Sequence, residues 1–291
     1  MRPIFLEWGS LLKTVLQLPH RVGIAFTHAA VQDATDAVVD VLHIKGHAIS
    51  PELMDHTQGT RGMDADILVR HAQVGLLFTT LEDIEWELYS DFEEGSSFEH
   101  AATLSHPRLA SLDVHRRFPG ISVHPDVAFD RLWQDRTTQT IAGITCTVPS
   151  VTAQRLILLL NTARGGSGHR DRGIAWDNAT NEEKRAVREL ARELDAEVAL
   201  ASAIGELDRW KHRREYAMWH YLSTGTGSAA QLWWARIKAE RTVVASIRRG
   251  FRLVLPTPHR MDLAARRELS PRELAAAYWR RVKGFFQRGR R

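Results

Sequence analysis

The sequence has a single cysteine, Cys146, no long apolar run and no histidine spacing that is typical of zinc sites. One cysteine excludes an intrachain disulfide and a zinc site built on several cysteines. The 14 histidines include no His-Glu-x-x-His motif. The longest aliphatic run, Leu156 to Leu160, is much shorter than the roughly 20 residues that a membrane-spanning helix needs. We therefore expect no transmembrane segment.

The N-terminal residues lack the features of a secretory signal. Met1-Arg2 is basic, but Pro3 and Glu7 interrupt the apolar residues, and no cleavage site of small residues follows. We therefore expect a cytoplasmic protein. The glycine-rich run Gly165 to Gly168 follows a predicted helix and not a strand, so it does not match a phosphate-binding loop.

Length and composition are those of a globular protein, but the charge is divided unevenly. The 291 residues suffice for one large or two ordinary domains, and 44% of them are hydrophobic and 25% charged. Arg209 to Arg291 holds 20 basic and 5 acidic residues, whereas the rest of the chain holds 19 and 30. The basic C-terminal half predicts an anionic partner. RNA, an anionic membrane surface and the acidic half of the same chain all remain open.

The most informative pattern lies between residues 41 and 69. A short apolar strand at residues 41–44 leads into Lys45-Gly46, and Asp64-Ala65-Asp66 opens a second apolar strand. Because side chains alternate along a strand, Asp64 and Asp66 point to the same side. Neighbouring carboxylates repel each other, and Mg²⁺ is commonly held by one or two carboxylates together with substrate phosphates. The pattern predicts a metal-dependent phosphoryl-transfer site, although Asp-x-Asp before a strand also occurs as solvated turn chemistry.

A third carboxylate follows in a later strand. Within residues 109–116, Leu112 and Val114 alternate with Asp113 and His115, so Asp113 and His115 share one face. If this strand lies next to the strand of Asp66, Asp113 reaches the same site. Three aspartates can hold two metal ions, which activate the attacking oxygen and stabilise the leaving oxygen.

These three pieces together resemble the uncharacterised nucleotidyltransferase family of the polymerase-beta-like superfamily, with Arg61 shortly before the Asp-x-Asp strand. The resemblance covers residues 40–120 well and later segments more weakly. It implies that Gly46 approaches the nucleotide phosphates and that the aspartates bind Mg²⁺ or Mn²⁺. The turn that is more familiar in the superfamily is Gly-Ser. Here it is Gly46-His47, so a serine contact to phosphate is absent.

The resemblance implies transfer of a nucleoside monophosphate from an NTP, such as ATP, to an acceptor. We expect Asp64, Asp66 and Asp113 to be the catalytic and metal-binding residues. The expected nucleotide-binding residues are Lys45, Gly46, Arg61 and His115. An ion pair to the aspartates remains an alternative for Arg61, an ordinary hydrogen bond for His115, and a plain left-handed turn for Gly46.

The acceptor and the role of the basic half are not fixed by these patterns. RNA (including tRNA), a protein and a small molecule all remain open as acceptors. A catalytically inactive protein that binds nucleotide or RNA is the alternative function. From the helical half of the chain, Arg164, Arg170 and Asp177 could reach the site and help to close it.

The predicted fold class is α+β, with a small mixed sheet and flanking helices. We expect a catalytic domain at residues 1–149 and a mainly helical, basic domain at residues 150–291. Strands are expected at residues 41–44, 64–69, 84–89, 109–116, 141–144 and 146–148. Helices are expected within 5–40, at 71–82, 151–163, 180–195, 196–215 and 229–249, and from 270 onwards. Two of them begin with the spacing of a capping box, Thr180 to Glu183 and Ser270 to Glu273.

Overall fold

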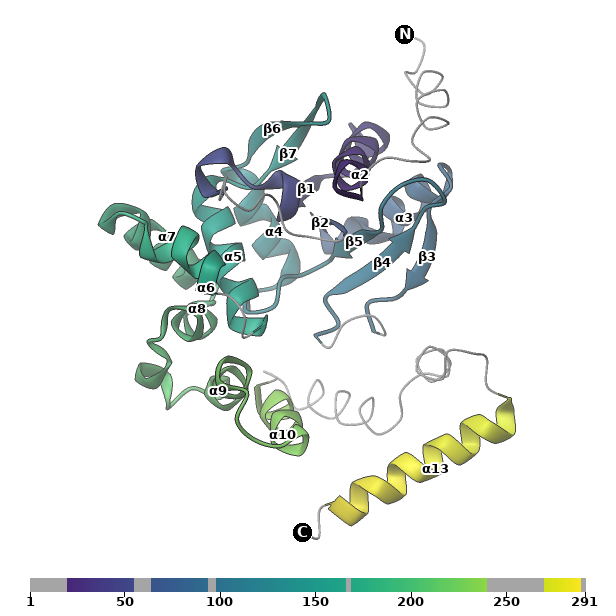
Figure 1. Ribbon diagram of the computed structural model, residues 1–291, viewed down its shortest axis with the longest axis vertical. Helices are drawn as coiled ribbons and strands as arrows, with labels where there is room; N and C mark the ends of the chain where they lie inside the picture. Colours follow the sequence, from purple (N-terminus) through teal and green to yellow (C-terminus); the bar gives the residue numbers. More distant parts are fainter. Residues whose placement is uncertain (1–19, 55–63, 94–97, 166–168, 240–269, 289–291) are drawn as a thin grey trace. The chain divides into compact units, whose positions relative to one another are not determined.

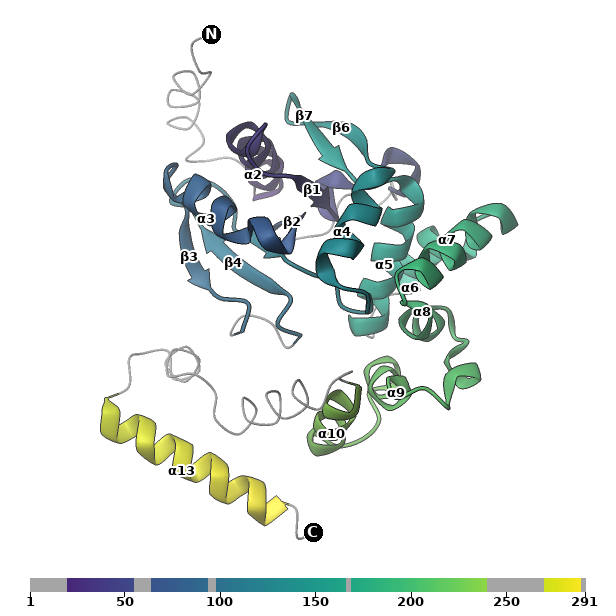
Figure 2. The same cartoon turned by 180° about the vertical axis from the view of Figure 1, so that it is seen from behind.

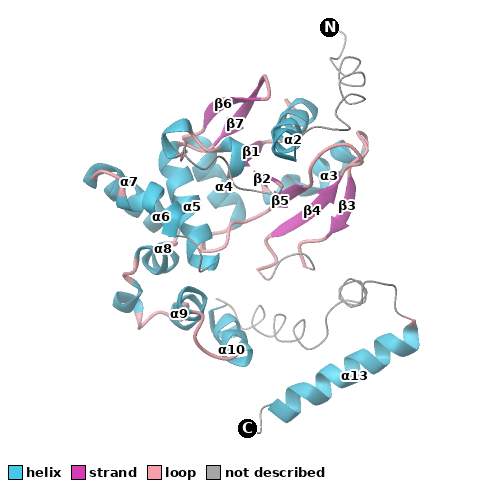
Figure 3. Ribbon diagram, in the orientation of Figure 1, coloured by secondary structure: helices cyan, strands magenta, loops and turns pink. Residues whose placement is uncertain are grey.

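The computed structural model describes residues 20–54, 64–93, 98–165, 169–239 and 270–288 (Figure 1). The chain divides into two compact units, Met1–Arg209 and Trp210–Arg291. The first unit contains all of the strands among the described residues, and the described part of the second is helical (Figure 3). The domain boundary that we expected after residue 149 stays a prediction.

Five strands of the first unit form one mixed sheet. The sequence predicted a small mixed sheet, although not all of its strands. The order in the sheet is β1-β2-β5-β4-β3, in which β2 and β5 are parallel and all other neighbours are antiparallel. β2 and β5 therefore run side by side in the same direction. The strands are β1 (Val41–Ile44), β2 (Ala65–Val69), β3 (Glu87–Ser90), β4 (Ala101–Ser105) and β5 (Leu112–His115).

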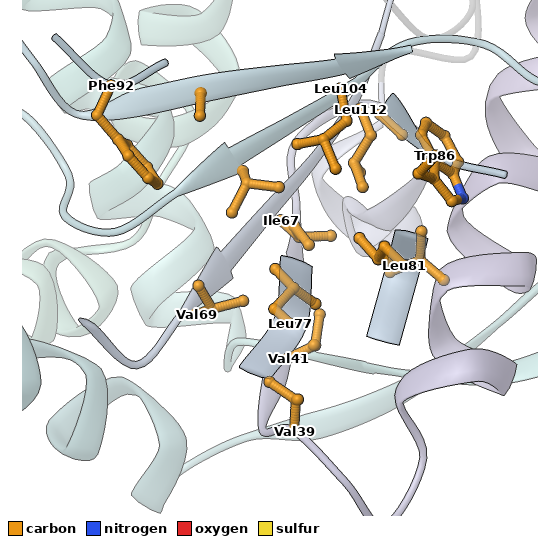
Figure 4. Packing of buried hydrophobic residues seen from close by; sticks show 14 of the residues in the cluster. Val39, Val41, Ile67, Val69, Leu77, Leu81, Trp86, Phe92, Leu104 and Leu112 are labelled. Carbon is orange, nitrogen blue, oxygen red and sulfur yellow. The ribbon is translucent and has the colours of Figure 1, made fainter. Parts of the chain in front are cut away.

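Burial of both faces explains the apolar sequences of the first two strands. All residues of β1 and β2 are buried, which fits their nearly continuous apolar sequences. The helices α2 (His20–Thr35) and α3 (Val74–Glu82) contact each other, and their apolar side chains enter the same core as those of the sheet. Figure 4 shows this core, and its labelled members include Ile67, Leu77, Leu81, Trp86, Leu104 and Leu112.

A separate two-stranded sheet follows. The predicted strand at residues 146–148 lies within it, whereas the strand predicted at residues 141–144 was wrong, because these residues span the turn. The observed strands are β6 (Thr137–Ile141) and β7 (Ile144–Val148), joined at Ala142-Gly143, where φ is +48° and +85°. Two consecutive positive φ values are the mark of a tight hairpin turn. Alanine at the first of these positions is unusual, so the sequence placed the turn later. The hairpin contacts α2, and both lie side by side in Figures 1 and 2.

Two further elements of this unit were missed. β4 has the sequence Ala-Ala-Thr-Leu-Ser, which carries little β-propensity, and its pairing between β3 and β5 makes it a strand. The helix α4 (Pro125–Gln134) begins with a proline, and the side chain of His124 accepts the backbone N–H of Asp126. Histidine is not a common N-cap residue, so the start of this helix is hard to recognise from the sequence.

The remaining helices of the first unit pack around α5 (Val151–Gly165), which contacts α7 (Asn181–Glu193) and α8 (Glu197–Ile204). The capping box at Thr180 and Glu183 is confirmed. The single helix predicted at 196–215 was wrong, because α8 ends at Gly205 in the left-handed conformation with φ +82°. Short helical turns follow at His169–Arg172 (α6), Gly173–Asp177 and Leu207–Trp210.

The described part of the second unit contains three helices, α9 (Tyr216–Thr224), α10 (Ala229–Ala239) and α13 (Pro271–Arg288). Of these, α9 and α10 contact each other. Ser270 and Glu273 exchange hydrogen bonds as the capping box predicted. None of the helices in the described ranges has the length and apolar character to cross a membrane.

A buried chain of neutral polar groups joins α2, β1 and β7. The Thr147 N–H donates to Oε1 of Gln32 at 3.0 Å, and this oxygen also lies 3.2 Å from Nε2 of His43. Since Oε1 only accepts, the proton of His43 is on Nε2, and its Nδ1 must accept from Nδ1 of His28 at 2.8 Å. Both histidines are fully buried. Nδ1 of His43 can accept this bond only while the His43 ring is neutral.

This pair predicts a pH-dependent stability. Burial lowers the pKa of His28 to about 4 and the pKa of His43 well below its ordinary value of 6.5. The unfolded chain therefore binds more protons than the folded protein below about pH 6.5, so stability is complete above that pH and is lost as the pH falls toward 4. Each histidine contributes a slope of up to about 1.4 kcal/mol per pH unit.

Urea unfolding between about pH 7 and pH 5 measures this slope. The His28→Gln/His43→Gln variant should show a flatter dependence of the unfolding free energy on pH, whatever its absolute stability. His71→Gln, at an exposed histidine, should keep the wild-type slope. An unchanged slope in the double variant would show that the pair does not titrate as described.

Gly120, between β5 and α4, generates a second prediction. Its φ is +101°, and a Cβ there would lie 2.9 Å from the Cβ of Ala199 and 3.0 Å from Cδ2 of Leu160. We expect Gly120→Ala to lower the free energy of unfolding by about 2 kcal/mol or more. Gly23→Ala in α2, where a Cβ meets nothing within 4 Å, should be neutral or stabilising. Equal urea midpoints for both variants would contradict the crowding of Gly120.

Candidate functional site

The site lies where the parallel strands β2 and β5 run side by side. Their register pairs Asp66 with Asp113, so the two carboxylates project from neighbouring positions of the sheet. Asp64 comes directly before β2 and is half-buried, as is Asp113, whereas Asp66 is only 8% exposed. One potential ligand atom from each of Asp66, Asp113 and His115 lies within 4.8 Å of the others. The structure thus brings Asp66 and Asp113 together, and Asp64 lies close enough to both to interact with them.

Asp66 is compensated by two groups that bind the same oxygen. Nζ of Lys45 lies 2.5 Å and Nε2 of His115 lies 2.8 Å from Oδ1 of Asp66. Burial raises the pKa of this carboxyl, but the ammonium of Lys45 and the hydrogen bond from His115 outweigh it and bring the pKa well below its ordinary range. Asp66 is therefore ionised in the folded protein.

Asp113 and Asp64 lack such compensation. Burial, followed by the charges of Asp64 and Asp66, raises the pKa of Asp113 to about 6, against the opposing effect of the Thr103 hydroxyl that donates to Oδ1 at 2.7 Å. Burial and the charge of Asp66 also raise the pKa of Asp64. The side chains of Asp64 and Asp113 lie within hydrogen-bond reach of each other. The three carboxylates thus hold more negative charge than their protein partners balance.

This donor set fits a hard divalent cation. Mg²⁺ and Mn²⁺ prefer carboxylate oxygens, and a cation between Asp64, Asp66 and Asp113 would balance the charge of these carboxylates. His115 fits a different role. Its Nε2 donates a proton to Asp66, so in this arrangement it orients the carboxylate and does not present a lone pair to a metal.

The turn at Lys45-Gly46 has an unusual backbone. Lys45 has φ +58° and ψ −176°, a conformation that is found almost only in glycine, and Gly46 has φ +47°. Such strain costs about 1–3 kcal/mol for a non-glycine residue. The residue before the turn, Ile44, pairs with Asp66 in the sheet, and this pairing explains how Lys45 reaches the carboxylate. The ammonium also lies 5.7 Å from the ring centre of Phe118.

The structure describes all of the predicted site residues except one. It brings Lys45, Asp64, Asp66, Asp113 and His115 together, and Gly46 follows directly after Lys45. Arg61 lies outside the described residues, so its predicted role stays a prediction.

The sequence missed two residues of the site. Thr103 binds Asp113 from β4, and the ring of His100 lies 5.1 Å from that of His115. Both belong to the stretch around β4, whose weak strand signal hid them. Thr103 alternates with the buried Ala102 and Leu104, and this alternation alone indicates that its side chain points to the opposite face of the sheet.

A comparison with protein-family models assigns the chain to a family. The model described as uncharacterised nucleotidyltransferase matches residues 35–210. The chain belongs to this family. It is therefore a nucleotidyltransferase, and the matched segment contains all strands of the described residues and all of the site residues named above.

Solved structures that resemble this nucleotidyltransferase have low sequence identity to it. A lincosamide antibiotic adenylyltransferase, LnuA, in complex with lincomycin is 15% identical over 55% of this chain and 92% of that chain, with a TM-score of 0.31. The antibiotic-resistance factor ANT(2'')-Ia is 14% identical over 66% and 95%, with a TM-score of 0.35. An antigenic nucleotidyltransferase-like protein from Paracoccidioides brasiliensis is 18% identical over 66% and 88%, also with a TM-score of 0.35. No curated protein matches the chain.

The excess of negative charge predicts that Asp113→Asn stabilises the nucleotidyltransferase when metal is absent. The folded carboxyl has a pKa of about 6 against an ordinary 3.8, so its ionisation opposes folding fully above pH 6. Asparagine removes this charge and keeps an oxygen that can accept from Thr103. We expect the free energy of unfolding in EDTA near pH 8 to rise by about 1 kcal/mol or more.

Added Mg²⁺ should make the wild type more stable than Asp113→Asn, because a ligand stabilises a folded protein that binds it. The wild type should gain stability with Mg²⁺, and Asp113→Asn should gain much less. Glu189→Gln removes an exposed carboxylate on α7 and should behave like the wild type in both buffers. A destabilised Asp113→Asn protein in EDTA would disprove the charge excess.

Proposed function

We propose that this nucleotidyltransferase moves a nucleoside monophosphate from an NTP to an acceptor hydroxyl in a metal-dependent reaction. The observation that carries the proposal is the register of β2 and β5, which sets Asp66 beside Asp113 with Asp64 in hydrogen-bond contact. Together with Lys45 this gives an acidic, oxygen-rich site next to a cation. Phosphoryl transfer depends mainly on such positioning and charge neutralisation.

In this proposal Asp64 and Asp66 hold the cation that binds the triphosphate, and His115 keeps Asp66 in place through its hydrogen bond. A bound Mg²⁺ supplies positive charge that stabilises the triphosphate and the leaving pyrophosphate. Lys45 and the backbone at Gly46 lie beside the carboxylates and face the same phosphates.

Asp113 acts on the acceptor in this scheme. Thr103 binds its Oδ1 and so fixes the direction of the carboxylate. Asp113 takes the proton of the acceptor hydroxyl as the acceptor oxygen forms a bond to the α-phosphorus. The bond between the α-phosphorus and its bridging oxygen breaks, and pyrophosphate leaves.

The acceptor is the open part of the proposal. The basic half of the chain, with 20 basic and 5 acidic residues between Arg209 and Arg291, makes RNA the first acceptor to test. Transfer to a protein or to a small molecule is the next comparison. A protein that only binds nucleotide is the second candidate function, because Gly46-His47 offers no serine hydroxyl to the phosphates.

The first experiment measures binding of NTP analogues with an α,β-methylene bridge, which cannot be cleaved, with and without Mg²⁺ by calorimetry. The wild type should bind at least one of the ATP, GTP, CTP and UTP analogues only with Mg²⁺. The Asp64→Asn/Asp66→Asn variant should lose this binding, and Glu189→Gln should keep it. If the wild type binds none of the four analogues, the proposal is wrong.

Transfer is then tested with NTPs labelled at the α-phosphate. Covalent label on RNA, on protein or on a hydroxyl compound supports the enzyme, provided that Asp113→Asn abolishes it. We expect this variant to lose at least about 100-fold in rate, because it lacks the base. Mg²⁺-dependent binding without label on any acceptor favours the binding protein instead.

A further inference from the structure

Arg164 in the last turn of α5 is held against the catalytic sheet by uncharged partners. Its Nη1 donates to Nε2 of His100, and its Nη2 donates to Oδ1 of Asn161 at 2.9 Å. Asn161 lies on the same helix, whereas His100 directly precedes β4. The guanidinium is thus fixed between the helix and the edge of the site.

The contact with His100 determines the state of that histidine. Arginine only donates, so Nε2 of His100 has no proton and the ring is neutral. The imidazole is 6% exposed, and burial followed by neighbouring cationic groups lowers its pKa far below the ordinary range. His100 therefore acts as a fixed acceptor for the guanidinium over the whole physiological pH range.

A short series of contacts leads from Arg164 to the carboxylates. The ring of His100 lies 5.1 Å from the ring of His115, whose Nε2 binds Asp66. Asp66 and Asp113 are near enough for their charges to raise the pKa of Arg164, although burial lowers it more. The guanidinium therefore faces the acidic site without touching it.

Arg164 has no carboxylate partner of its own within the described ranges, where its hydrogen bonds go to an imidazole and an amide. On the same helix, the more deeply buried Arg155 is paired with a carboxylate, since it binds Glu183 at 2.5 Å. A partly buried guanidinium without a counter-ion is ready for an anionic ligand, and its forked donors match phosphate oxygens.

We propose that Arg164, positioned by His100, binds the triphosphate group of the NTP substrate. This inference depends on the proposed function, since it assigns a ligand to the same site. The carboxylates would hold the triphosphate through a cation from one side, and Arg164 would bind non-bridging oxygens from the side of α5. His100 is a positioning residue here and does not touch the ligand.

The test compares binding of the triphosphate and monophosphate of the same nucleoside. Calorimetry in Mg²⁺ uses the α,β-methylene NTP analogue that the wild type prefers, together with the matching NMP. Arg164→Gln should weaken binding of the analogue by about 10- to 100-fold, the range expected for a lost charged hydrogen bond. Binding of the NMP should change by less than about 3-fold.

A matched pair at His100 tests its positioning role. Glutamine can place an oxygen near the position of Nε2, whereas methionine fills the space and offers no strong acceptor. His100→Met should reproduce the selective loss of triphosphate affinity, and His100→Gln should restore most of it. Thermal unfolding of both variants reports on folding separately. Equal affinity losses in the two variants, or equal losses for analogue and NMP, would assign these residues a structural role.

The two hypotheses fail in different ways. If the wild type does not bind any NTP analogue, the proposed function fails, and the assignment of Arg164 falls with it. If the wild type binds the analogue in Mg²⁺ and Arg164→Gln binds it equally well, only the assignment of Arg164 is wrong. An effect of Arg164→Gln on the KM for RNA alone would place the guanidinium on the acceptor instead.

Discussion

The parallel pairing of β2 with β5 imposes the constraint on which the site depends. It fixes Asp66 beside Asp113 in a sheet that cannot relax their separation, and Asp64 adds a third carboxyl. Like charges at such a distance oppose folding unless each is balanced. The balance is incomplete: Lys45 and His115 bind Asp66, and only a hydroxyl binds the Oδ1 of Asp113. A bound cation would balance the remaining excess of negative charge.

Elements outside the sheet keep Lys45 in place beside Asp66. The hairpin β6–β7 reaches the turn after Lys45, where the side-chain amide of Gln139 donates to the carbonyl of His47 at 2.9 Å. On the other side, the N–H of Ser50 donates at 2.7 Å to Gln154, a residue of α5. The strained backbone of Lys45 is thus held from two directions. This explains why the small second sheet and α5 belong to the same compact unit as the site.

The sequence predicted the parts of the fold that local patterns determine. The alternation around Asp66 and Asp113 was enough to predict two strands with carboxylates on one face, and the capping box at Thr180 marked the start of α7. β4 and the end of α8 could not be predicted in this way. The strand β4 exists because two neighbours pair with it, and the helix at residues 196–215 was extended through Gly205, whose left-handed φ depends on context.

The site residues that were not predicted from the sequence also depend on tertiary structure and not on local patterns. Thr103 and His100 became visible only when β4 was placed between β3 and β5, because neither belongs to a recognisable motif. A motif identifies residues that contact the reacting groups directly. The residues that orient them come from whichever element the fold brings near, and their identity is a property of the tertiary structure.

The interpretation of Asp64-Ala65-Asp66 as solvated turn charge was wrong for Asp66, whose exposure is 8%. Turn chemistry exposes carboxylates to water. Here Asp66 is buried, and Asp64 and the neighbouring Asp113 have raised pKa values. Lys45 adds a backbone conformation that is unfavourable for any residue but glycine. These unfavourable terms occur together at one edge of an otherwise regular, apolar core. A protein under selection for stability alone would not retain them together, and ligand binding at this edge accounts for all of them.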